Sequence, residues 1–186
     1  MLSGTALSDS ITLDLHKWFS VPMGASVFIT NHKNILGKSF AIRTDYMPPQ
    51  GDHHITDPYT NSIQWSRRFI GLKFYLPLLV HGWKGYAKVI DHQTKMGILL
   101  KERLQSSGWN VANKTLLPVI CFHDDSLSEY QMTKLCSEIN SSGKYWVSNY
   151  PIGHLNTIRA CITNYQTNEI TIDHFVKLIE ELKSNL

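Results

Sequence analysis

Lys17 is the residue of this chain whose position best suits covalent chemistry. In residues 11–16, apolar and polar side chains alternate, which is typical of a half-buried strand. Lys17 follows directly, and the bulky pair Trp18 and Phe19 comes next. An amine that aromatic side chains keep dry can act as a nucleophile toward a carbonyl carbon. We therefore expect a sheltered Lys17, and the alternative is an ordinary solvated lysine.

A second strand is expected to hold Lys17 in a turn. Residues 25–30 are rich in strand-forming side chains, and Pro22 and Gly24 interrupt the backbone pattern before them. The sequence therefore predicts a strand, a turn that carries Lys17, and another strand.

Arg159 is a second candidate for chemistry, because it lies inside a predicted strand over 157–163. A buried or half-buried arginine requires an anionic partner. That partner is either a substrate carboxylate, held by the planar guanidinium, or a carboxylate of the chain in a structural ion pair.

Three segments, in this order, resemble the group II pyridoxal-phosphate-dependent amino-acid decarboxylases. They are D-S-I-T-L-D-L-H-K-W-F-S-V-P-M-G (9–24), S-I-Q-W-S-R-R-F-I-G-L-K-F-Y-L-P-L (62–78) and T-I-R-A-C-I-T-N (157–164). In that family the lysine of His-Lys-Trp binds the cofactor covalently, so the resemblance points to Lys17. It implies an α/β fold: the C-terminal part of a fold-type I cofactor-binding large domain, followed by a small α+β C-terminal domain.

The resemblance also implies roles for four other residues. His16 and, more weakly, Ser10 would lie near the cofactor phosphate, and Arg159 would hold the substrate α-carboxylate. Tyr46 would be the loop tyrosine that returns a proton after CO₂ leaves. The alternatives are a hydrogen-bonded His16 without a ligand, an ordinary strand hydroxyl at Ser10 and an unimportant exposed Tyr46.

The implied cofactor is pyridoxal 5'-phosphate, which takes up the electrons left when an L-amino acid loses CO₂ to give an amine. The family's other cofactor-holding elements precede the lysine segment, and only sixteen residues precede Lys17 here. We therefore expect the chain alone to bind cofactor poorly and to need an upstream decarboxylase portion. A homodimer is implied as well. The alternatives are an aldehyde synthase or other lyase of the same fold, and an inactive partner subunit; acidic, aromatic and diamino substrates remain open.

Composition excludes other classes of function. The net charge of +3 is small and scattered, which argues against a nucleic-acid-binding protein. The longest apolar stretch, 69–83, is interrupted by Lys73, Pro77 and His81 and falls short of the roughly 20 residues that a membrane span needs. Three widely spaced cysteines and the absence of a signal peptide favour the cytoplasm. No metal site is expected, because the loop pair His53-His54 lacks a ligand spacing.

The predicted elements suggest two domains, over residues 1–82 and 83–186. Residues 31–61 contain many helix and strand breakers and predict a long loop. A helix is expected over 62–80, kinked or ended by Pro77, and breaks at Gly82 and Gly85 precede a helix over 86–104. The later elements are expected as strands over 109–112, 117–123, 145–149 and 157–163, a helix near 127–140 and a last helix that opens at 171.

Overall fold

The fold is that of a computed structural model, which describes residues 3–42, 45–46 and 57–186. The chain divides into two compact units, Met1–Gly82 and Trp83–Leu186. Each unit is described by itself below. Among the described residues, no helix is both long and apolar enough to cross a membrane.

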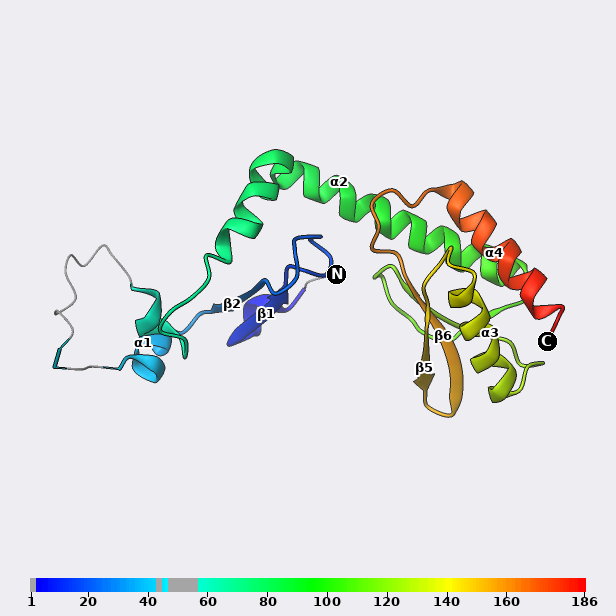
Figure 1. The fold of residues 1–186 in the computed structure, drawn as a ribbon, viewed down its shortest axis with the longest axis horizontal. Coiled ribbons are helices and arrows are strands. Elements are labelled where there is room, and N and C mark those ends of the chain that lie inside the picture. Colours follow the sequence, from blue (N-terminus) through cyan, green and yellow to red (C-terminus); the bar gives the residue numbers. More distant parts are fainter. Residues whose placement is uncertain (1–2, 43–44, 47–56) are drawn as a thin grey trace. The chain divides into compact units, whose positions relative to one another are not determined.

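The first unit contains the β-hairpin that the alternating pattern predicts. Strands β1 (Ser10–Asp14) and β2 (Ser26–Thr30) pair antiparallel, after a short 3₁₀ helix η1 (Thr5–Leu7) (Figure 1). Ile11 lies opposite Ile29, so apolar side chains gather on one face of the hairpin. The prediction of two strands that flank Lys17 is confirmed.

The described residues within 31–61 are more regular than predicted. They contain the short helix α1 (Ile35–Phe40) and the 3₁₀ helix η2 (Pro58–Asn61). The expectation of a loop without helices was wrong here. Helix α1 has weak sequence signals, because its N-cap Asn34 makes no side-chain capping bond and Gly37 lies inside it.

Helix α2 (Gly71–Ser106) begins later than predicted and changes direction at Gly82, where φ is 62° and ψ is 173°. Glycine adopts this positive φ at little cost. The prediction allowed a kink or an end at Pro77; Pro77 lies inside the helix and does not end it, and the non-helical φ and ψ lie at Gly82. Proline removes one backbone hydrogen bond, and here the helix continues despite that loss. Gly85 also lies within the helix and does not break it.

The second unit is a small α+β arrangement, as the predicted elements suggested. Its four-stranded sheet has the order β3-β4-β6-β5, and all its pairs are antiparallel (Figure 1). The strands are β3 (Asn110–Val111), β4 (Val119–His123), β5 (Ser148–Ile152) and β6 (Leu155–Cys161). Besides the later part of α2, its helices are α3 (Glu129–Ser141) and α4 (Glu169–Lys183), and a capping box opens each of these two.

One apolar core unites these elements. It combines the later part of α2 with one face of the sheet and with the inner faces of α3 and α4. Phe122 is fully buried at its centre, and its ring meets that of Trp109 edge to face at 5.2 Å. This core supplies the second unit with its own hydrophobic stabilisation.

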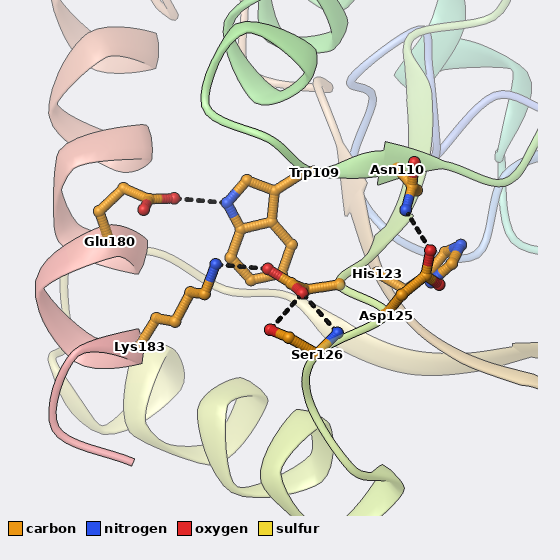
Figure 2. A network of polar contacts seen from close by, with 8 residues as sticks. Trp109, Asn110, His123, Asp125, Ser126, Glu180 and Lys183 are labelled. Carbon is orange, nitrogen blue, oxygen red and sulfur yellow. Dashed lines mark hydrogen bonds and ion pairs between the residues drawn. The ribbon is translucent and has the colours of Figure 1, made fainter.

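Polar contacts fix the C-terminal half of α4 over the turn that follows β4. Lys183 pairs with Asp124, whose carboxylate also accepts hydrogen bonds from Ser126 (Figure 2). The Trp109 indole donates to Glu180 at 2.5 Å. Although burial raises the pKa of Asp124, the bonds from Lys183 and Ser126 outweigh it and lower the pKa to about 2.

Candidate active site around Lys17

Lys17 lies in a well-anchored turn between β1 and β2. Its backbone N–H donates to the carbonyl of Asp14 at 3.2 Å, and its own carbonyl accepts from Ser20 at 3.2 Å. Ser20 has a φ of +54°, so the chain reverses sharply after the lysine.

Buried side chains on both sides hold this turn. Leu15 and Val21 are almost fully buried and pack with Ala25 in a small core. The Phe19 ring meets Phe74 of α2 edge to face at 5.7 Å. These contacts fix the backbone that carries Lys17.

The Lys17 amine is open to solvent, with 70% of its side chain exposed. The expectation of a lysine kept dry by Trp18 and Phe19 was wrong for this chain. Phe19 instead packs on Phe74 of α2. Among the described residues, the charged partner of the amine is Asp14, at 2.7 Å.

His16 lies beside Lys17 and is held by one backbone carbonyl. Its Nδ1 lies 2.9 Å from the carbonyl oxygen of Ala25, which also accepts the His16 backbone N–H at 3.2 Å. A carbonyl only accepts, so Nδ1 carries the proton and Nε2 is left for another partner. An accessible amine next to this imidazole suits an aldehyde-bearing phosphate ester such as pyridoxal phosphate, so these residues fit that cofactor.

The other two candidates of the first unit lie at the surface. Ser10 is exposed at the opposite end of β1, roughly 13 Å along the strand from Asp14 at about 3.3 Å per residue. The structure therefore does not bring Ser10 together with His16 and Lys17. Tyr46 is in a turn and 76% exposed. The roles assigned to both stay predictions.

Arg159 lies in β6 of the second unit, on the sheet face opposite the core. Its neighbours Ile158 and Ala160 are buried in that core, so the alternation along the strand turns Arg159 the other way. It is half-buried, opposite Cys121 on β4 and Ser148 on β5. Within the described parts of the chain, no carboxylate forms an ion pair with its guanidinium. The alternative of a structural ion pair is therefore not found among these residues, and the role of Arg159 stays a prediction.

The charge of Arg159 affects the pKa of two cysteine thiols, Cys121 and Cys161. Burial raises the pKa of the Cys121 and Cys161 thiols, and the positive charge of Arg159 partly offsets that rise. All three cysteines are free thiols, with Cys121 and Cys136 buried and Cys161 partly buried.

The pair His53-His54 lies outside the described residues, so the expectation of no metal site there stays a prediction. In the described ranges, no three His, Cys, Asp or Glu side chains are grouped so that they could hold a metal ion.

Sequence reasoning missed Asp14 and Ser26 as parts of this site. The signal for Asp14 was its position three residues before Lys17, a spacing that a turn can close. Ser26 gives no local signal, because its contact with Asp14 depends on the register of the hairpin.

The comparisons with known proteins point to one family. The family model described as the pyridoxal-dependent decarboxylase conserved domain matches residues 1–124, which include the Lys17 turn. An aromatic-L-amino-acid decarboxylase of Bacillus atrophaeus is 27% identical over 99% of this chain and 40% of its own length. A 4-hydroxyphenylacetaldehyde synthase of Rhodiola rosea is 24% identical over 100% of this chain and 39% of its own length.

The fold has matches among solved structures as well. That of Catharanthus roseus tryptophan decarboxylase in complex with L-tryptophan matches with a TM-score of 0.85 at 21% identity. The match covers 100% of this chain and 39% of that one. The chain thus spans about 40% of the length of the two relatives from Bacillus atrophaeus and Rhodiola rosea. Because the family model covers well over half of the sequence, including the predicted cofactor lysine, the chain belongs to the pyridoxal-dependent decarboxylase family.

Proposed function

We propose that this chain is the C-terminal, lysine-bearing portion of an enzyme that removes CO₂ from an L-amino acid and releases an amine. The observation that carries the proposal is the Lys17 turn, which has a fixed backbone, an accessible amine and the His16 imidazole beside it. Pyridoxal phosphate, when bound, supplies the electron sink that no side chain offers. Lys17 would hold it, and His16 would contact its phosphate.

The chain is proposed to work with the portion of its relatives that it does not span. The exposure of Lys17 supports this, because an active-site amine is shielded from water by surrounding residues, and the described residues do not shield it. The hairpin has exposed apolar side chains, among them Ile29, which is 56% exposed. Contact with such a portion would bury them. A homodimer, as the family resemblance implies, is part of the same proposal.

The chain alone is expected to bind pyridoxal phosphate weakly and to show no turnover. Equilibrium dialysis of the isolated chain with the cofactor, followed by an assay for released CO₂, measures both properties. Tight binding or turnover by the isolated chain would contradict the need for a further portion.

Arg159 is proposed to bind the substrate α-carboxylate. In the complete enzyme, Arg159→Lys should raise KM for the amino acid about ten-fold, because lysine keeps the charge and loses the two-pronged geometry. The affinity for the amine product, which lacks that carboxylate, should stay unchanged.

Arg103→Lys is the matched control, since Arg103 pairs with Asp173 at 2.7 Å on the surface of the second unit. It should leave both affinities unaltered. Equal losses of amino-acid and amine affinity in Arg159→Lys would point to a structural role and overturn the assignment.

The second candidate function is aldehyde formation, which the likeness to the Rhodiola rosea synthase favours. Tyr46 supports plain decarboxylation instead, because by resemblance a phenylalanine there would favour the oxidative route. Product analysis separates the two: amine with CO₂, or aldehyde with CO₂, ammonia and peroxide. A catalytically inactive partner subunit would yield neither set of products.

A further inference from the structure

Asp14 makes two contacts with separate carboxylate oxygens. Oδ2 lies 2.7 Å from the Lys17 amine, and Oδ1 accepts a hydrogen bond of 2.5 Å from the Ser26 hydroxyl. The carboxylate is therefore held from one side by the neighbouring strand and presented to the lysine on the other.

The hairpin itself produces this arrangement. Asp14 and Ser26 are directly opposite each other in the β1–β2 register, which brings the hydroxyl to the carboxylate. The backbone hydrogen bond from the Lys17 N–H to the Asp14 carbonyl closes a turn after β1, and this turn brings Lys17 close to Asp14. The hydrogen bonds from Lys17 and Ser26 lower the pKa of Asp14 below its ordinary value, which shows that both contacts favour the charged carboxylate.

We propose that Asp14, oriented by Ser26, is a positioning residue for Lys17. The carboxylate holds the Lys17 amine at the end of the hairpin, which limits the four-carbon side chain to one region before the cofactor arrives. The amine must leave this contact before it can attack a carbonyl or an activated arene, so the contact also slows unspecific reactions of Lys17. The role of the Asp14–Lys17 contact in cofactor binding rests on the proposed function. The contact itself is a property of the chain without cofactor.

The test measures the reactivity of Lys17 without cofactor. The full chain is treated with trinitrobenzenesulfonate at neutral pH, and the labelling rate at each lysine is obtained by peptide mass spectrometry. Asp14→Asn should speed labelling at Lys17 about two- to five-fold, the range expected for an exposed ion pair, and leave exposed Lys33 unchanged. Ser26→Ala should act in the same direction with a smaller effect.

Salt provides a readout that a merely structural role would not give. Raising the ionic strength should speed labelling at Lys17 in the unchanged chain, because it screens the pair, and should have no such effect in Asp14→Asn. Asp9→Asn is the matched control on the same hairpin, where Asp9 contacts His32 at 2.8 Å. It should leave Lys17 labelling as it is.

Equal Lys17 rates in the unchanged chain and in Asp14→Asn would overturn the proposal. A parallel rise at Lys33, or a salt effect that persists in Asp14→Asn, would also overturn it. Because no cofactor is present, these outcomes are independent of whether Lys17 binds pyridoxal phosphate.

Discussion

Replacing Lys17 with arginine in the complete enzyme is expected to abolish covalent cofactor attachment and to lower kcat/KM about a thousand-fold or more. Arginine keeps the positive charge that Asp14 contacts at 2.7 Å, yet its guanidinium does not lose its proton and cannot act as a nucleophile. The exposed position should leave folding unchanged. Borohydride reduction followed by mass measurement reports the attachment, and CO₂ release reports the rate.

The matched control is Lys33→Arg, which changes another exposed lysine of the first unit. It should retain full attachment and activity. If Lys17→Arg still carried reduced cofactor in stoichiometric amounts, another lysine would be the attachment site and the assignment of Lys17 would be wrong.

Replacing Lys183 with methionine is expected to destabilise the second unit by about 2 kcal/mol at neutral pH. Asp124 is only 10% exposed, and its pKa of about 2 in the folded chain lies below the ordinary 3.8. A carboxyl whose pKa is lower in the folded chain than in the unfolded chain stabilises the folded state at pH values above its unfolded pKa. The contribution of Asp124 to the free energy of unfolding is therefore complete above about pH 4. It is lost as the pH falls from about 4 to about 2. Urea unfolding at several pH values measures it.

Lys177→Met on the same helix is the control, because Lys177 lies 3.7 Å from Glu181 in an exposed pair. It should change the stability by less than about 0.5 kcal/mol. Two results would show that the pair does not act as described. One is a Lys183→Met chain that is as stable as the original at neutral pH. The other is a Lys183→Met chain whose free energy of unfolding falls as much between about pH 4 and 2 as that of the original.

Local patterns predicted most of the secondary structure. The alternation before Lys17 predicted β1, and the apolar face of residues 175–182 predicted α4. These elements follow patterns that a short window of sequence contains. The identity of Lys17 as a candidate came from the same short-range signal, together with the family resemblance.

Features that depend on tertiary contacts could not be predicted in this way. Phe19 packs on Phe74, which is 55 positions further along the chain, a contact that no short window of sequence contains. The Lys183–Asp124 pair likewise joins residues 59 positions apart. Helix α2 continues through Pro77 and turns at Gly82 instead, although both residues are helix breakers by propensity.

Borohydride trapping of the complete, unmodified enzyme with pyridoxal phosphate, followed by peptide mapping, tests the central claim most directly. The account predicts one cofactor-labelled peptide, with the label on Lys17. A label on any other lysine, or none on this chain while the enzyme releases CO₂, would contradict it.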